Sequence, residues 1–405
     1  MRVLVQKFGG TSVRNLECMK QVQAKVQAAL DRGDKVVVVL SAMAGETDRL
    51  LGLARQWAPR PDLAEMDVLV STGEQVSVAL FTMLLKDAGI KARSLLGFQV
   101  DMKTTGAFAK ARILSIDEQK CRALMDQYDV LVMAGFQGWT EDGRITTLGR
   151  GGSDTSAVAL AAALKADECE IYTDVEGVYT TDPNMCSRAR KMDKISYDVM
   201  LEFAGMGAKV LQIRSVEFAK KYNVPVQVRS TFSDAPGTLV TKEDPTMEAV
   251  LVSGIAYDKD QARITLHDVP DRPGIAAALF GPLAEKGILV DMIIQNAGQG
   301  AHTDMTFTIP RADLEQTMEI LADVNSVIGA REILHDVNVC KVSAIGVGMR
   351  SHSGVAARAF KALKDENINI LMISTSEIKI TLLIEEKYLE LAVRTLHKAF
   401  GLDTN

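Results

Sequence analysis

The sequence predicts an α/β protein: a three-layer α/β/α domain with a mostly parallel sheet, followed by two small ferredoxin-like βαββαβ modules. From residue 1 to about residue 240, short β-branched runs alternate with longer helical patterns. Such alternation is typical of a parallel sheet that is covered by helices on both faces. Beyond that point the sequence repeats itself at a constant offset, which Gly274 and Gly354 give as 354 − 274 = 80 residues. A repeat of this kind indicates two copies of one structural unit.

Strands and helices alternate in the first part of the chain. The apolar, β-branched runs that read as buried strands are Val3–Val5, Val36–Leu40, Val130–Met133 and Glu170–Thr173. Helical spacing, or a high content of alanine and leucine, marks Leu16–Leu30, Gln75–Ala88, Glu118–Asp126 and Asp154–Leu164. Ser230–Pro245 is rich in Ser, Thr, Asp, Pro and Gly, so it is the expected linker.

The C-terminal repeat keeps one register over a turn, a helix and the next strand. Residues 271–280 (DRPGIAAALF) parallel residues 351–360 (SHSGVAARAF), and the same offset joins Ile288 to Ile368. Each copy reads as strand, glycine turn, helix, strand, strand, helix, which is the pattern of a ferredoxin-like unit. We therefore expect the α/β domain at 1–240, a linker with the first strand of the C-terminal region at 241–260, and the two modules at 261–339 and 340–405.

Composition limits the classes to which the protein can belong. At 405 residues the chain exceeds the usual size of one hydrophobic core, so two or three domains are expected. An apolar fraction of 47% with 24% charged residues is that of a soluble globular protein. The formal net charge of -6 argues against nucleic acid as a partner, because phosphate backbones require a basic surface.

The cysteines and the N-terminus indicate a cytoplasmic protein. The five cysteines are scattered and form no C-x-x-C pair, so neither a zinc cluster nor a disulfide framework is expected. The apolar run after Met1 is too short for a signal peptide. No stretch approaches the about 20 apolar residues that cross a membrane, so no membrane partner is expected.

The first motif that could carry chemistry is Lys7-Phe8-Gly9-Gly10-Thr11-Ser12, where a strand ends and a helix begins. Two glycines let the backbone approach an anion closely, and N–H groups at a helix start favour negative charge. Lys7 adds a mobile positive charge suited to a phosphoryl group. A tight turn with a surface lysine would give the same pattern, so this segment alone leaves both interpretations open.

The second motif is Leu148-Gly149-Arg150-Gly151-Gly152-Ser153-Asp154-Thr155, just before the alanine-rich helix Ser156–Leu164. Its glycines surround an arginine, the side chain best shaped to hold a carboxylate at two points. Asp154 could in addition cap the helix. A third segment, Tyr172–Pro183, runs from a strand into a polar loop suited to a base and a ribose, or forms an ordinary turn.

Single residues add to these motifs. Ser41 follows the strand Val36–Leu40, at the carboxyl end where open α/β sheets bind ligands. Glu74 stands at an expected helix start, as a functional carboxylate or as a partner of the helix dipole. Lys209 could meet a phosphate, or could be a solvated surface lysine.

The absent motifs narrow the reaction. The sequence has neither a P-loop nor the motifs of protein kinases, and all five histidines lie beyond the expected linker. A hydroxyl acceptor benefits from a general base such as histidine. A carboxylate acceptor is already ionised at neutral pH and requires none. The residues therefore favour phosphoryl transfer to a carboxylate, in which positioning and charge neutralisation do the catalysis.

Taken together, the motifs resemble one family. The segments Lys7–Ser12, Ser41–Met43, Thr72–Glu74, Gly149–Asp154 and Tyr172–Asp174 are similar to those of monofunctional aspartate kinases, and the similarity covers essentially the whole chain. The resemblance implies an amino-acid-kinase fold followed by two ACT modules. It also implies ATP, Mg²⁺ and L-aspartate, with 4-phospho-L-aspartate as product. That reaction is the first step of lysine, threonine, methionine and diaminopimelate synthesis.

The resemblance assigns roles to individual residues. The catalytic residues would be Lys7, Asp154 and Arg150, with Asp154 orienting Lys7. Aspartate would be bound by Thr47, Glu74, Arg150 and Ser153, with Arg150 on a substrate carboxylate and Glu74 near the amino group. The nucleotide would be bound by Lys7, Phe8, Gly9, Gly10, Ser41, Thr173, Asp174, Tyr179 and Lys209. Metal ligands are not assigned. After Asp182-Pro183 the family commonly has Arg, whereas Asn184 stands here.

In the C-terminal pair, the resemblance implies feedback inhibition by lysine, by threonine or by both. The inhibitors would lie near Asp271, Gly274, Ile275, Ala276, Ala277, Gln295, Asn296, Asn369, Ile370, Ser376 and Glu377. Ala356 and Gly298 replace a Thr and a Ser that are common in the family, so the effector stays open. ACT-like modules tend to pair edge to edge, so we expect a homo-oligomer in which a ligand between modules biases two arrangements. A short subunit starting near Met247 is a further hypothesis.

Two alternatives remain beside this interpretation. Another acylphosphate-forming kinase, acting on glutamate or N-acetylglutamate, would share the first domain but not the tandem pair. A non-catalytic amino-acid sensor would have no need to keep Lys7, Glu74, Arg150 and Asp154 together. A fusion with homoserine dehydrogenase is not expected, because the sequence ends at Asn405 just after the second repeat.

Overall fold

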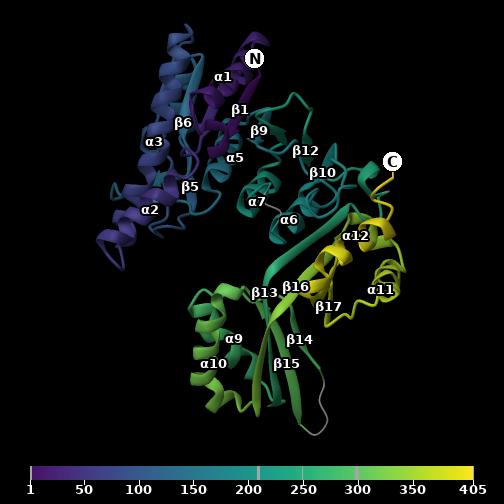
Figure 1. The fold of residues 1–405 in the computed structure, drawn as a ribbon. Helices are drawn as coiled ribbons and strands as arrows, with labels where there is room; N and C mark the ends of the chain where they lie inside the picture. The colour runs from purple at the N-terminus through teal and green to yellow at the C-terminus, as the bar shows by residue number, and fades with distance from the viewer. Residues whose placement is uncertain (1, 208–209, 249, 297–300, 405) are drawn as a thin grey trace. The chain divides into compact units, whose positions relative to one another are not determined.

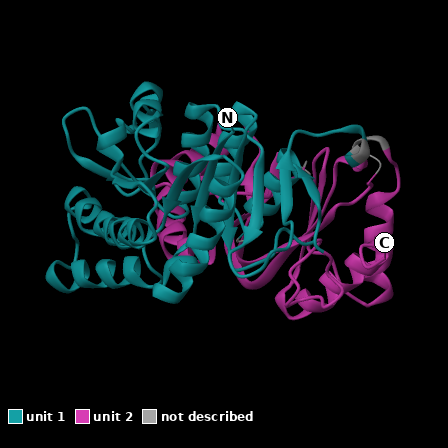
Figure 2. Cartoon of the chain, turned by 90° about the horizontal axis from the view of Figure 1, so that it is seen from above, with its two compact units in different colours: residues 1–179, 191–249 teal, residues 180–190, 250–405 magenta. Residues whose placement is uncertain are grey.

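The computed structural model describes residues 2–207, 210–248, 250–296 and 301–404 (Figure 1). The chain forms two compact units (Figure 2). The α/β unit contains residues 1–179 and 191–249, and the C-terminal unit contains residues 180–190 and 250–405. The expected boundary at residue 240 thus falls at 249/250 instead, and the expected range 1–240 does not anticipate that 180–190 belongs to the other unit.

An eight-stranded sheet forms the centre of the α/β unit, with strand order β10-β12-β11-β9-β1-β2-β6-β3. All its described pairings are parallel except that of β11 with β12, which confirms the predicted, mostly parallel sheet. The strands are β1 (Val3–Phe8), β2 (Lys35–Leu40), β3 (Ala92–Leu95), β6 (Val130–Ala134), β9 (Glu168–Thr173), β10 (Lys194–Ser196), β11 (Val226–Ser230) and β12 (Thr238–Thr241). Because β12 pairs with two strands of this sheet, the segment Ser230–Pro245 is part of the domain and the linker prediction there is wrong.

Helices cover both faces of the sheet and complete the three layers. They are α1 (Leu16–Asp31), α2 (Glu46–Trp57), α3 (Leu63–Asp87), α4 (Glu118–Met125), α5 (Gly152–Leu164), α6 (Tyr197–Gly205), α7 (Ile213–Tyr222) and α8 (Pro245–Glu248). Val22 of α1 and Phe81 of α3 share one apolar core with Leu4 and Phe8 of β1, so these helices cover one face. On the other face α5 packs against β1 and β9. A small second sheet orders β5 (Ile113–Ser115), β4 (Lys103–Thr104), β7 (Gln137–Trp139) and β8 (Ile145–Thr147).

Helix α3 corrects two expectations. It begins at Leu63 rather than near Gln75, because Asp62 caps it by accepting from the N–H groups of Ala64 and Glu65. Gly73 lies inside the helix, where a Cβ would come within 2.8 Å of the Ala42 Cβ, so the glycine marks close packing and not a helix start. Glu74 is therefore mid-helix and is no partner of a helix dipole. By length and composition α3 could also span a membrane, yet half of its apolar window is buried, as in a core helix.

The C-terminal unit is one six-stranded sheet with two ferredoxin-like modules on it, in the order β14-β15-β13-β16-β18-β17. Its elements are β13 (Gly254–Pro270), α9 (Ile275–Glu285), β14 (Ile293–Gln295), β15 (His302–Ile309), α10 (Leu314–Ile328), β16 (Glu332–Ile345), α11 (Val355–Asp365), β17 (Met372–Thr375), β18 (Lys379–Glu385) and α12 (Leu389–Ala399). The two long antiparallel strands β13 and β16 each serve both modules. The second module closes with the start of β13, whose Gly254 pairs with Ile345, so the predicted borders at 260/261 and 339/340 fall inside strands.

Residues 180–190 form an excursion of the chain into the C-terminal unit. The Ile255 N–H donates to the Thr180 carbonyl at 2.7 Å, and the Tyr257 hydroxyl donates to Asp182 Oδ2 at 2.8 Å. Arg394 Nε donates to the Met185 carbonyl at 2.9 Å. At 190/191 the chain returns, and the Met192 N–H donates to the Val178 carbonyl within the α/β unit. Hydrogen bonds within the C-terminal unit thus hold residues 180–190. In sequence, these residues come between β9 and β10 of the α/β unit.

Candidate active site

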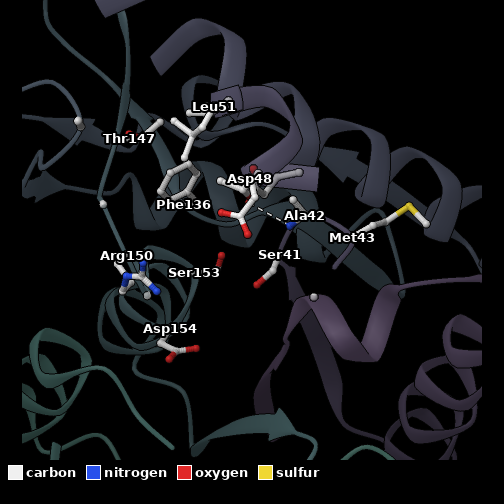
Figure 3. Close-up of a pocket in the computed structure, with 18 of the residues that line it drawn as sticks. Ser41, Ala42, Met43, Asp48, Leu51, Phe136, Thr147, Arg150, Ser153 and Asp154 are labelled. Carbon is white, nitrogen blue, oxygen red and sulfur yellow. Dashed lines mark hydrogen bonds between the residues drawn. The ribbon is translucent and has the colours of Figure 1, made fainter. Parts of the chain in front are cut away.

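A cavity of about 480 Å³ opens at the carboxyl ends of β1 and β2 and at the start of α5 (Figure 3). This is the edge at which parallel sheets bind ligands. Eight of the residues that the sequence singled out line it: Lys7, Gly10, Ser41, Thr47, Glu74, Arg150, Ser153 and Asp154. They come from four separate segments, which the fold brings together.

Lys7 and Asp154 form a buried ion pair in this cavity. Successive side chains of a strand alternate between faces, so Phe8 enters the core beneath α1 and α3 while Lys7 faces α5. Lys7 Nζ lies 2.6 Å from Asp154 Oδ1, and both side chains are 11% exposed. The carboxylate thus holds the ammonium at a fixed place on the cavity wall, where charge interactions are stronger than in water.

The glycines at the end of β1 form a close backbone contact. A Cβ on Gly10 would lie 2.8 Å from the Ala42 carbonyl oxygen, so no larger residue fits there. The Ala44 N–H donates to the Gly10 carbonyl at 3.2 Å, and Ser41 N–H to the Phe8 carbonyl at 3.2 Å. These contacts bring the loop after β2 against the loop after β1, and both loops border the cavity.

The loop between β8 and α5 (residues 148–151, the Arg150 loop) also depends on glycine. Gly149 and Gly151 have φ of +78° and +68°, in the left-handed region that other residues rarely adopt. A Cβ on Gly151 would in addition lie 2.2 Å from Gln212 Cγ. Arg150, held between them, is exposed at the rim of the cavity next to the start of α5. This placement gives the guanidinium access to a ligand, while the loop backbone stays fixed.

Glu74 is the most perturbed carboxyl group lining the cavity. Its side chain is 3% exposed, Oε1 accepts from the Ala42 N–H at 3.0 Å, and Oε2 has no hydrogen-bond partner. Burial raises the pKa of Glu74 to about 7, although two backbone N–H groups act to lower it. A buried carboxylate with a free oxygen is suited to a cationic ligand group, which would supply the missing partner.

The remaining predicted nucleotide residues that the structure describes are not part of the cavity wall. The Phe8 side chain is buried and stacks on Tyr172 at 4.5 Å between ring centroids, so only its backbone is available to a ligand. Thr173 and Asp174 stand at the carboxyl end of β9, the neighbour of β1. Tyr179 follows in the next loop and is half-buried. Lys209 lies outside the described residues.

Sequence reasoning missed several residues of the cavity wall, and three of them stand out. Asp67 is a buried carboxylate on α3, about two turns before Glu74. Phe136 and Ala109 are non-glycine residues with φ of +69° and +63°. Such strain is concentrated at functional sites. The signal for Asp67 was an acidic residue inside an apolar helix; no sequence pattern marks the two strained residues.

The effector positions that the resemblance implied lie at corresponding places in the two modules. Gly274 and Gly354 cap α9 and α11 with φ of +96° and +94°, which agrees with the repeat. Asp271, Ala276, Ala277, Gln295, Asn296, Asn369, Ser376 and Glu377 are exposed, Ile370 is half-buried and Ile275 is buried. Gly298 lies outside the described residues.

A second cavity, of about 400 Å³, lies between α1 and the face of the eight-stranded sheet that α1 covers, which is not the face covered by α5. Each described cation that lines it is paired with a carboxylate: Arg2 with Glu168, Lys25 with Asp234, Arg32 with Asp34, and Arg229 with Glu170. Its charges are thus satisfied within the protein, whereas Glu74 in the first cavity has a free oxygen. The first cavity is the better candidate for an active site.

Comparisons with known proteins decide the family. The model of the amino acid kinase family matches residues 2–230, and that of the ACT domain matches residues 267–324 and 342–400. A Pseudomonas putida protein named aspartate kinase is 56% identical over 404 residues, which cover 100% of this chain and 98% of the relative. The chain belongs to the aspartate kinase family.

Other aspartate kinases extend this comparison. The Helicobacter pylori aspartokinase (strain J99) is 52% identical over 405 residues, covering 99% of this chain and 100% of that protein. Escherichia coli aspartokinase III in complex with aspartate and ADP, in the R-state, has 29% identity and a TM-score of 0.82, with 98% and 99% of the two chains covered. The same enzyme with lysine and aspartate, in the T-state, gives a TM-score of 0.77. This aspartate kinase is therefore an enzyme that phosphorylates aspartate and carries regulatory ACT domains, as the sequence predicted.

Proposed function

We propose that this aspartate kinase transfers the γ-phosphoryl group of ATP to the side-chain carboxylate of L-aspartate, as the first step of lysine, threonine, methionine and diaminopimelate synthesis. The observation that carries the proposal is the cavity in which the Lys7–Asp154 pair, Glu74 and Arg150 meet. An aspartate carboxylate oxygen attacks the γ-phosphorus, the bond to the β,γ-bridging oxygen breaks, and its electron pair leaves on ADP. The product is 4-phospho-L-aspartate. No proton has to be removed from the acceptor.

The cavity offers a partner for each charged group of aspartate. Arg150 can hold a substrate carboxylate at two points from the rim. The free oxygen of Glu74 suits the ammonium group. Thr47 and Ser153 add hydroxyl groups on the same wall. Lys7 then faces the γ-phosphoryl group, and Asp154 keeps it in place. Together these residues would align acceptor and donor and reduce their mutual repulsion.

The nucleotide would lie from the glycines after β1 toward Thr173, Asp174 and Tyr179. Mg²⁺ usually keeps few protein ligands in kinases and is held mainly by phosphates and water. A single exposed carboxylate, that of Asp174 just after β9, fits this mode. Asp174 is the residue we expect to meet the metal. When bound, the ion neutralises charge on the phosphates.

Regulation by lysine, by threonine or by both is proposed for the ACT pair. The Escherichia coli enzyme is described in complex with lysine in its T-state, which supports lysine as the first effector to test. A homo-oligomer through the ACT modules, a short subunit starting near Met247, and a cytoplasmic location remain proposals. The location is supported by the five cysteines, which are all buried and unpaired.

A hydroxylamine-trapping assay tests the reaction. With ATP and Mg²⁺, we expect an aspartyl hydroxamate from aspartate and none from glutamate or N-acetylglutamate. Product from either of these acceptors but not from aspartate would overturn the proposal. Repeating the assay with lysine, with threonine and with both identifies the effector, and mass spectrometry of the native complex detects any short subunit.

The raised pKa of Glu74 predicts a pH dependence of aspartate binding. Glu74 must be ionised to pair with the ammonium group, so KM for aspartate should rise as the pH falls below about 7, by up to about tenfold per pH unit. The Glu74→Gln variant should have a high KM at every pH. A wild-type KM that does not change between pH 8 and pH 6 would contradict this role.

The same variant has a stability signature. Because folding raises the pKa of Glu74 above its ordinary 4.5, ionisation opposes folding, and this cost grows from about pH 4.5 to pH 7 and is then constant. Glu74→Gln should therefore raise the free energy of unfolding above pH 7 by up to about 3 kcal/mol, and by less at pH 5. Denaturant melts at both pH values measure the difference.

A further inference from the structure

Asp67 lines the cavity, and both oxygens of its buried carboxylate accept hydrogen bonds. It is 1% exposed on α3. Its Oδ1 accepts from the Ala109 N–H at 3.1 Å and from the Thr147 hydroxyl at 2.6 Å. Its Oδ2 accepts from the Ala109 N–H at 3.0 Å and from the Thr147 N–H at 2.8 Å. Hydrogen bonds to an ionised acceptor are about twice as strong as neutral ones, so this carboxylate ties two separate segments to α3.

Of the two segments that Asp67 binds, one packs against the Arg150 loop and the other leads into it. Ala109 is kept in the left-handed region, and its carbonyl oxygen lies 2.9 Å from the place that a Cβ of Gly149 would take. Thr147 stands at the end of β8, three residues before Arg150. Asp67 thus fixes the strand that leads into the loop and the backbone that packs against it.

A guanidinium holds the same backbone from α7. Arg214 donates one hydrogen bond to the Leu148 carbonyl at 2.6 Å and another to the Ala111 carbonyl at 2.8 Å. The residues just before Gly149 are therefore fixed between a carboxylate and a guanidinium. Both side chains bond to backbone that leads into the Arg150 loop or packs against it.

We infer that Asp67 is a positioning residue that acts through Arg150, placing the guanidinium for the substrate carboxylate. This role rests on the proposed function. Because the Arg150 side chain is exposed, the position of its backbone determines where the guanidinium can enter the cavity. A displacement of about 1 Å in a binding group can cost about 10²-fold in rate. Asp67 has no oxygen free to touch aspartate itself.

Removing the Asp67 carboxylate should weaken aspartate binding selectively. We expect Asp67→Ala to raise KM for aspartate about 10²-fold and to change KM for ATP by less than about twofold. Asp67→Asn should raise KM for aspartate about tenfold, because its amide keeps one acceptor and can donate to the Thr147 hydroxyl. Thr147→Val, which removes one of the four hydrogen bonds, should have a similar intermediate effect. If Asp67→Ala does not fold, Asp67→Asn and Thr147→Val carry the test.

Combination with Arg150→Ala separates positioning from general destabilisation. If Asp67 acts through Arg150, adding Asp67→Asn to Arg150→Ala should change KM for aspartate by less than about twofold. Additive effects, or equal rises in the two KM values, would overturn the inference. Thr82→Val is the matched control, since Thr82 is buried on the same helix and its hydroxyl has no partner. Failure of the wild-type chain to phosphorylate aspartate would instead refute the proposed function.

Discussion

Lys7→Ala is expected to lower kcat by about 10³-fold or more while the chain stays folded. The Lys7 ammonium lies 2.6 Å from Asp154 Oδ1 at the carboxyl end of β1, next to the glycine backbone that we assign to the phosphates. Its charge is needed most when negative charge develops on the transferring group, so the loss should appear in kcat more than in KM for aspartate. Turnover by hydroxamate formation and a thermal melt of the same sample provide the two measurements.

A double variant separates the catalytic loss from the structural one. Lys7→Ala leaves the buried Asp154 carboxylate without its ammonium partner, which should cost about 3 kcal/mol of stability. Lys7→Ala with Asp154→Asn removes the unpaired charge, so it should regain stability but not turnover. Lys25→Ala is the control, because it deletes another ion pair of 2.6 Å, with Asp234, away from the cavity. Near-normal activity in Lys7→Ala would remove Lys7 from the mechanism.

Arg150→Lys should lower kcat/KM for aspartate by about 10²-fold, with KM for ATP nearly unchanged. Lysine keeps the charge but not the planar, two-point geometry that matches a carboxylate. Because Arg150 is exposed between two glycines, the substitution should leave the melting temperature unchanged. The prediction is checked by steady-state kinetics with each substrate varied in turn.

Arg144→Lys is the matched control for Arg150→Lys. Arg144 lies at the start of the same strand region and pairs with Glu65 at 2.8 Å on the surface. Surface pairs of this kind contribute little, so this variant should keep wild-type kinetics. Equal losses in the two variants would show that the effect is not specific to Arg150.

Local patterns and the internal repeat were sufficient to predict the main architecture of both parts of the chain. The parallel sheet and the tandem modules follow from alternating runs and from a constant offset, and the structure confirms both. Lys7 and Ser41 could be brought together because the carboxyl ends of parallel strands meet at one edge.

The features that were missed depend on partners far away in sequence. Glu74 was expected at a helix start, and only the contact of Gly73 with Ala42 shows why a glycine lies inside α3. Asp67 has its partners 42 and 80 residues further along the chain, so no local pattern could assign its role. The segment Tyr172–Pro183 was interpreted as a nucleotide-binding loop or an ordinary turn, although residues 180–190 belong to the C-terminal unit, where Asp182 accepts from the Tyr257 hydroxyl.

Because residues 180–190 belong to the C-terminal unit, a gene cut once between the two units would separate them from their partners. A polypeptide starting at Met247 would carry the whole ACT pair but would lack residues 180–190. The buried His397, which lies 2.9 Å from the Thr180 hydroxyl, and the Tyr257 hydroxyl would then lose those bonds. Conversely, a fragment ending at residue 249 would carry an eleven-residue segment without its partners. A single cut in the sequence therefore cannot separate the two units. Exchanging regulatory regions between relatives requires moving residues 180–190 together with residues 250–405.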